Sequence, residues 1–208
     1  MKKYVVLAGN IGAGKSTLVS LLADRLGFTP YYEPVAENPY LEEFYADMPR
    51  WAFHSQIFFL MHRVRTHRAL MDDRRPVVQD RSLYEDAEIF ARNLSDQGIM
   101  SPRDWDSYHN LYETVAGLLP APDLVVYLRA SVATLRKRIA RRGRDFESGI
   151  SDDYLAGLNS LYDAWTANFS LAPVLTVDGD SLDFVDRPAD LETVLASLRR
   201  QAREAGQD

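Results

Sequence analysis

Eight residues near the start of the chain form a glycine-rich pattern that constrains its fold more than any other feature. Residues 9–16 match G-x-x-x-x-G-K-[ST], between an apolar run at 4–8 and a helical-looking segment at 17–26. In this setting backbone N–H groups can surround a phosphate, Lys15 can reach the β- and γ-phosphate oxygens, and Ser16 can ligate Mg²⁺. The pattern predicts a nucleotide-binding loop; the alternative is an ordinary glycine turn. The residues expected to bind phosphate are Gly9, Asn10, Gly12, Ala13, Gly14, Lys15, Ser16 and Thr17.

The composition fits one domain with a small-molecule ligand. The 208 residues are 46% hydrophobic, and 24 basic against 30 acidic residues give a formal net charge of −6. Such an acidic chain is a poor candidate for nucleic-acid binding. It has no cysteine, which fits a reducing compartment, and its first apolar run is too short for a signal peptide or a membrane span. We expect a single cytoplasmic domain over residues 1–208 that binds neither nucleic acid nor membrane.

Apolar runs and helical segments alternate along the chain. Short apolar runs are typical of buried parallel strands, and a 3.6-residue period is typical of amphipathic helices. The expected strands are residues 4–8, 29–32, 76–80, 124–128 and 174–178. The expected helices are residues 17–26, 51–70, 83–93, 102–118, 132–142, 152–169 and 189–201. The alternation predicts an α/β fold with a five-stranded parallel sheet flanked by helices.

The segment 51–70 is unusual because it is apolar on nearly every side around residues 57–61. One face of this helix should contact the sheet, and another should meet a second buried surface. A partner subunit could supply that surface. We therefore expect a homodimer formed through this helix.

Acidic residues stand where two of the predicted strands end. Glu33 follows the second strand, at the edge where ligands of open α/β sheets bind, and could accept the proton of an attacking hydroxyl. Asp80 ends the third strand, placed like an acid that helps hold Mg²⁺ through water, and Arg81 could contact the acceptor or the transferred phosphoryl group. The alternatives are a surface acid before a turn and a helix-capping Asp with a solvated Arg.

Two helices carry polar residues on otherwise apolar faces. Gln56, Phe59 and Arg63 share one stripe of the first helix, and Asp86 and Phe90 share a face of the next. Together they could bind the edge of a nucleobase and stack on its plane. The alternative is a buried Arg63–Asp86 ion pair without a ligand, which would be costly.

One dense basic run stands out in this acidic chain. It contains Arg136, Lys137, Arg138, Arg141, Arg142 and Arg144. Beside a phosphate-binding loop, such a run favours a clamp on phosphoryl oxygens, because the planar guanidinium binds them in two places and keeps its charge. A solvated or RNA-binding segment is the alternative.

Several motifs together resemble the deoxyribonucleoside kinase family. They are residues 9–16, Glu33-Pro34-Val35, Asn38-Pro39-Tyr40, Arg50-Trp51 with Gln56, Asp80-Arg81-Ser82 with Tyr84-Glu85-Asp86, Arg142-Gly143-Arg144 with Glu147, and Val177-Asp178-Gly179-Asp180 with Asp183-Phe184. Their order and spacing match over residues 4–185, and the chain is most similar to the bacterial deoxyadenosine kinases. The resemblance implies a P-loop kinase fold with an arginine-rich lid at about 138–149, and a dimeric enzyme of deoxynucleoside salvage.

The resemblance also implies a role for each site residue. Glu33 would be the general base for the sugar 5′-hydroxyl, beside the catalytic groups Arg81 and Lys15. The base and sugar would be bound by Tyr45, Gln56, Phe59, Arg63, Arg81, Asp86, Phe90 and Glu147. The donor ATP, with Mg²⁺ at Ser16 and Asp80, would be held by Arg138, Arg142, Arg144, Asp183 and Phe184. Asn38 departs from the pattern, because animal relatives have an aromatic residue there.

The same groups suggest which nucleoside is accepted. Adenine and cytosine each present an exocyclic amine beside a ring acceptor, which suits Asp86 and the Gln56 amide, whereas thymine presents a carbonyl. We expect deoxyadenosine to rank first, deoxycytidine and deoxyguanosine next, and thymidine to be poor. Two other functions stay open at this stage: a nucleoside monophosphate kinase of the thymidylate type, where Glu33 would repel the acceptor phosphate, and a non-catalytic nucleotide switch.

Overall fold

The computed structural model describes residues 4–33, 37–144, 147 and 149–204. Within them, one sheet contains β1 (Tyr4–Gly9), β2 (Thr29–Tyr31), β3 (Val77–Asp80), β4 (Leu124–Arg129) and β5 (Val174–Asp178) in the order β2-β3-β1-β4-β5. Every neighbouring pair is parallel. The predicted α/β class and five-stranded parallel sheet are confirmed.

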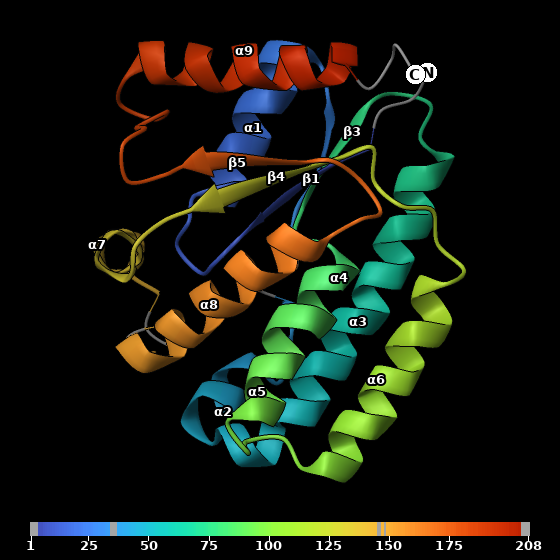
Figure 1. The fold of residues 1–208 in the computed structure, drawn as a ribbon. Coiled ribbons are helices and arrows are strands. Elements are labelled where there is room, and N and C mark those ends of the chain that lie inside the picture. Colours follow the sequence, from blue (N-terminus) through green and yellow to red (C-terminus); the bar gives the residue numbers. More distant parts are fainter. Residues whose placement is uncertain (1–3, 34–36, 145–146, 148, 205–208) are drawn as a thin grey trace.

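Helices cover both faces of the sheet (Figure 1). The helices α1 (Lys15–Leu26) and α9 (Pro188–Glu204) lie on one face, and α3 (Met48–Asp72), α4 (Leu83–Glu85) and α8 (Asp152–Asn168) lie on the other, with α6 (Pro102–Ala116) packed against α3. At the edge where β4 and β5 end lies α7 (Val132–Arg142). Strand β1 is buried along its whole length, which explains its continuous apolar sequence.

Two elements differ from the expectation from sequence. The short helix α2 (Leu41–Ala46) was not predicted, and the segment expected as a helix over 83–93 is helical throughout but is not one regular α-helix. That region runs through α4, a π-helix (Asp86–Ala91) and α5 (Arg92–Asp96). At its end the Arg92 N–H donates to the Ala87 carbonyl, five residues back. A search for a 3.6-residue period cannot detect this wider turn.

The helix α3 is longer than expected because its N-terminus is capped. The Asp47 side chain accepts a hydrogen bond from the Arg50 N–H, with proline in the first turn. At its far end His67 contacts the Tyr4 ring edge-on, with ring centroids 5.4 Å apart. The other sides of α3 pack on α2, α6 and the π-helix of the same chain, while Met61 stays 41% exposed. No helix in the described part of the chain is long and apolar enough to cross a bilayer.

Candidate active site

The glycine-rich loop joins β1 to α1 and depends on backbone conformations that favour glycine. Gly12 and Gly14 have φ angles of 81° and 99°. Lys15 folds back over the loop, and its Nζ donates to the carbonyls of Gly9 at 2.9 Å and Asn10 at 3.0 Å. Burial and the nearby Arg81 lower the pKa of Lys15 to about 8. The ammonium group is thus held where phosphate oxygens could replace the two carbonyls.

The loop is also fastened to α8 from behind. The Asn10 amide donates to the Leu155 carbonyl at 2.9 Å and to Asn159 Oδ1 at 2.8 Å. The Asn10 side chain therefore anchors the loop to α8. It is not directed at the site where the loop is expected to bind phosphate. Gly9, Asn10 and Ala13 do not line the cavity described next.

A cavity of about 740 Å³ opens beside the loop, and residues from several helices, strands and loops line it. It brings together most of the residues singled out from sequence. These are Gly12, Gly14, Lys15, Ser16, Thr17, Glu33, Tyr45, Gln56, Phe59, Asp80, Arg81, Asp86, Phe90, Arg138, Arg142, Arg144, Glu147, Asp183 and Phe184. Its volume is within the range of small-molecule sites, and it has a basic, loop-lined end and an aromatic, helix-lined end.

The residues at the end of β3 fit a magnesium ion that also binds phosphate. Ser16 Oγ donates to Asp80 Oδ2 at 2.5 Å, and Asp80 Oδ1 is buried without a hydrogen-bond partner. Among the described residues no group of three or more His, Cys, Asp or Glu side chains could hold a metal. One carboxylate and one hydroxyl suit Mg²⁺, which usually keeps waters and takes further ligands from substrate phosphates.

Glu33 lies in a network of buried charges. Its Oε1 accepts from Arg63 Nη2 at 2.7 Å and lies 3.3 Å from Arg81 Nε. Arg63 is 1% exposed, and its Nε donates to Asp86 Oδ2 at 2.9 Å while Nη1 donates to the Asp80 carbonyl at 2.8 Å. Burial opposes ionisation of Glu33, but Arg81, Arg63 and Lys15 outweigh it and lower its pKa. The carboxylate is therefore ionised and able to accept a proton.

The Arg63–Asp86 pair anticipated from sequence forms, and it limits what Arg63 can do. All three guanidinium nitrogens have protein acceptors, and Arg63 is not part of the cavity wall. Asp86 does line the cavity, and its pKa is raised by burial against the opposing charge of Arg63. In this geometry Arg63 orients Glu33 and Asp86, while Gln56 and Asp86 are the polar residues of these helices that face the cavity.

Arg81 has a strained backbone and a buried guanidinium beside Glu33. It is the one non-glycine residue with positive φ, 64°, in the described part of the chain, a conformation that costs about 1 to 3 kcal/mol. Its guanidinium stacks over Phe90, 4.0 Å from the ring centroid. Its buried Nε makes no hydrogen bond. The Nε lies 3.3 Å from Glu33 Oε1, so Arg81 acts on Glu33 through its charge.

The basic residues of α7 and the segment after it reach the cavity from the edge of the sheet. Arg138 donates to the Ala13 carbonyl at 2.9 Å and the Gly179 carbonyl at 2.7 Å. Arg142 Nε and Arg144 Nη1 donate to the buried Glu147 carboxylate at 3.1 and 3.3 Å. Residues 145, 146 and 148 of the expected lid at 138–149 lie outside the described residues.

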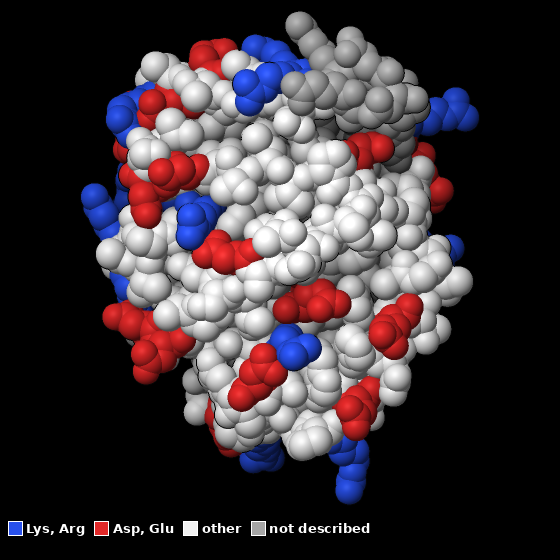
Figure 2. All heavy atoms as spheres, viewed as in Figure 1, with Lys and Arg blue, Asp and Glu red and all other residues white. Residues whose placement is uncertain are grey.

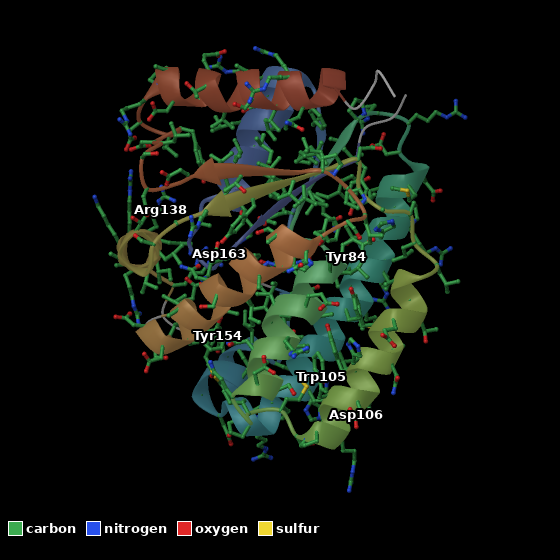
Figure 3. The ribbon with its side chains drawn as sticks, viewed as in Figure 1. Tyr84, Trp105, Asp106, Arg138, Tyr154 and Asp163 are labelled. Carbon is green, nitrogen blue, oxygen red and sulfur yellow. The ribbon has the colours of Figure 1, made fainter. Side chains whose placement is uncertain are left out.

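Several cavity residues were missed from sequence. Leu41 and Phe44 come from the unpredicted α2, and Tyr154 comes from the first turn of α8. Figure 3 shows Tyr154 on α8 and Arg138 on α7, at the same edge of the molecule. Leu41 and Phe44 gave no signal because only one turn and a half of helix carries them. Tyr154 could have been found, since Ser151 caps the helix that presents it.

Phe184 and Asn38 are both buried and bonded or packed within the protein. The Phe184 ring packs against the phosphate loop, where a Cβ added at Gly14 would lie 3.2 Å from it. Asn38, at the position that departs from the family pattern, donates from Nδ2 to Ser55 Oγ at 3.0 Å. It links the segment before α2 to α3, and Ser55 itself lines the cavity.

Comparisons with known proteins agree with the fold. The sequence profile of the deoxynucleoside kinase family matches residues 5–202. The chain is 38% identical to the deoxyadenosine/deoxycytidine kinase of Bacillus subtilis, covering 93% of this chain and 90% of that protein. It is 37% identical to the deoxyadenosine kinase of Lactobacillus acidophilus, covering 99% of both, and 36% identical to the deoxyguanosine kinase of Bacillus subtilis, covering 94% of this chain and 96% of that one.

A solved structure of a deoxyadenosine kinase has the same fold as this chain. The deoxyadenosine kinase from M. mycoides, with products dCMP and dCDP bound, superposes with a TM-score of 0.85 at 32% identity, over 95% of this chain and 99% of that chain. The same enzyme with bound dATP gives a TM-score of 0.84. The family profile, the full-length relatives and the shared architecture lead to one conclusion: this chain belongs to the deoxynucleoside kinase family and is a kinase with the P-loop fold.

Proposed function

We propose that the chain transfers the γ-phosphoryl group of ATP to the 5′-hydroxyl of a deoxynucleoside, with deoxyadenosine preferred. The observation that carries the proposal is the position of Glu33: an ionised carboxylate in the same cavity as Lys15 and the phosphate loop. A hydroxyl placed between Glu33 and the γ-phosphate could give its proton to the carboxylate as it attacks. Phosphoryl transfer then needs mainly alignment and charge neutralisation, which Lys15 and Arg81 can supply.

The magnesium ion expected with ATP would be held by Ser16 Oγ and Asp80, directly or through water. Its contribution would be to neutralise charge on the phosphoryl oxygens. Arg142 and Arg144 are bonded to Glu147. We propose that they join Arg138 around the phosphates and that Glu147, with Tyr45, contacts the 3′-hydroxyl.

The preference for deoxyadenosine rests on Asp86 and Gln56. Arg63 occupies Asp86 Oδ2, which leaves the other carboxylate oxygen for an exocyclic amine of the base. Thymine offers a carbonyl there and would leave a buried carboxylate oxygen unpaired, at about 1 to 3 kcal/mol. Guanine can still offer its N1–H. Relatives named for deoxyadenosine, deoxycytidine and deoxyguanosine are all similar to this chain, so the rank order depends on this pocket.

A substrate panel tests the proposal. With ATP and Mg²⁺, kcat/KM should be highest for deoxyadenosine, lower for deoxycytidine and deoxyguanosine, and at least tenfold lower for thymidine. Highest activity on thymidine monophosphate would favour the thymidylate-kinase alternative. Asp86→Asn should lose at least tenfold in kcat/KM for deoxyadenosine. The matched control is Asp106→Asn on the exposed side of α6 (Figure 3), which should change nothing.

We propose further that two copies associate through α3. The support is that Met61 on α3 and Leu111 on α6 remain 41% and 44% exposed on two helices packed together. A dimer by light scattering, converted to a monomer by Met61→Glu, is the expected result. A wild-type monomer at micromolar concentration would contradict it. The cytoplasmic location stays a prediction.

A further inference from the structure

A second buried carboxyl group lies behind the phosphate loop and takes no part in the mechanism above. Glu85 is 0% exposed. Its Oε2 accepts from the Ser82 N–H at 2.9 Å and from Ser82 Oγ at 3.3 Å, and its Oε1 accepts from the Gly9 N–H at 3.3 Å. The remaining neighbour of Oε1 is the Tyr162 hydroxyl, 2.8 Å away. Tyr162 comes from α8, which crosses the same face of the sheet as α4 (Figure 3). Its side chain is fully buried.

The Tyr162 hydroxyl has two acceptors and one proton. It lies 2.8 Å from Glu85 Oε1 and also 2.8 Å from the Gly9 carbonyl oxygen. If Glu85 is ionised, both neighbours can only accept, and one of the two contacts has no hydrogen in it. If Glu85 carries a proton on Oε1, that proton bonds the Tyr162 oxygen and the Tyr162 proton bonds the Gly9 carbonyl. The neutral carboxyl gives each of the two contacts a hydrogen of its own, whereas the ionised one leaves them to share a single proton.

The charges around Glu85 are compatible with a neutral group. Burial raises the pKa of Glu85, against the opposing charges of Arg81 after β3 and Lys15 on α1. The other titratable groups close enough to interact electrostatically with Glu85 are tyrosines: Tyr162 on α8, Tyr4 on β1 and Tyr127 on β4.

The Gly9 carbonyl is the point where this pair meets the catalytic loop. It accepts from Lys15 Nζ at 2.9 Å as well as from Tyr162. Strand β4 packs closely against Gly9, since a Cβ added there would lie 2.8 Å from the Leu128 carbonyl oxygen. When Lys15 turns to bind phosphate, this buried carbonyl loses one of its two donors. Tyr162 then becomes the donor that prevents an unpaired acceptor.

We propose that Glu85 and Tyr162 are positioning residues of the phosphate loop: a neutral Glu85 directs the Tyr162 hydroxyl onto the Gly9 carbonyl and so releases Lys15 to bind ATP. The inference rests on the proposed contact between Lys15 and the ATP phosphates. It adds a function for the Glu of the Tyr84-Glu85-Asp86 motif that is separate from base recognition by Asp86.

Three variants test the proposal by ATP binding. Tyr162→Phe should weaken ATP about threefold to tenfold, the effect of one hydrogen bond, and leave the KM for the nucleoside unchanged. Glu85→Gln retains a donor toward Tyr162 and should bind ATP within about twofold of wild type. The matched control Tyr127→Phe removes the hydroxyl of a neighbouring buried tyrosine, which donates to Asp163 at 3.1 Å instead, and should also bind ATP normally.

The protonation state has its own readout. The infrared spectrum of the wild-type protein should contain the carbonyl band of a buried protonated carboxylic acid, and Glu85→Gln should remove it. Its absence from the wild type, weakening by Glu85→Gln equal to that by Tyr162→Phe, or normal ATP binding by Tyr162→Phe would each overturn the proposal. Because calorimetric ATP binding and infrared absorption need no turnover, a wild type that phosphorylated no deoxynucleoside would contradict the proposed function and leave this test intact.

Discussion

Replacing Glu33 by glutamine separates its chemical role from its structural one. The amide oxygen can still accept the 2.7 Å bond from Arg63, but the negative charge beside Arg63 and Arg81 is lost. A bond to a charged group is worth about 1.5–3 kcal/mol and one between neutral groups about 0.5–1.5. Asp86 still neutralises Arg63, so we expect a loss of stability of about 2 kcal/mol. For a chain of this size that lowers Tm by about 4–8 °C.

The effect of the same variant on turnover should be much larger. A positioned general base contributes about 10²- to 10⁴-fold, so kcat for deoxyadenosine should fall by at least a hundredfold, with nucleoside affinity within a few fold. Steady-state kinetics at saturating ATP, well below the lowered Tm, measure both. Glu42→Gln, the same change at an exposed site on α2, is the control and should match wild type. A kcat within tenfold of wild type in a folded Glu33→Gln protein would remove Glu33 from the role of base.

Three further predictions concern the phosphate loop and the magnesium site proposed beside it. Because the pKa of Lys15 is lowered to about 8, kcat/KM for ATP should fall as the pH rises above about 8, where the free enzyme loses the ammonium charge; a flat profile to pH 10 would contradict this. Asp80→Asn should raise the Mg²⁺ concentration needed for half-maximal activity without preventing folding, as measured by metal titration and thermal unfolding. Gly12→Ala forces a Cβ to 2.9 Å from Ile139 Cγ1 at a φ of +81° and should lower stability by at least about 1 kcal/mol; an unchanged Tm would show that the loop adapts.

Sequence patterns predicted the layers of this fold because a buried parallel sheet leaves a strong signal. In strand β4 (Leu124–Arg129) the first five residues are an uninterrupted apolar run and are all buried, and only Arg129 at its end is exposed. Helix α7 begins and ends where it was expected, because Ser131 caps its start and Gly143 adopts a left-handed conformation at its end. Local chemistry sets these boundaries, so local sequence reveals them.

The parts that could not be predicted depend on contacts distant in sequence. Nothing local indicates that Arg63 is enclosed by Glu33, Asp86 and the Asp80 carbonyl, so a residue assigned to base recognition proves to be bonded to the protein at every nitrogen. The Asn10 side chain is committed to α8 for a similar reason, since its partners lie about 150 residues away. A motif identifies which residues lie together at a site, whereas the contacts and role of each residue depend on the tertiary packing.

The placement of Arg63 has a consequence for how specificity and catalysis relate. One guanidinium binds both the proposed base-recognition carboxylate, Asp86, and the proposed general base, Glu33. Removing the charge at Asp86 leaves Arg63 with Glu33 alone, which strengthens that pair and lowers the basicity of Glu33 further. Substitutions that change which base is accepted should therefore also slow phosphoryl transfer. The two properties are coupled through a residue that the structure gives no direct contact with the cavity.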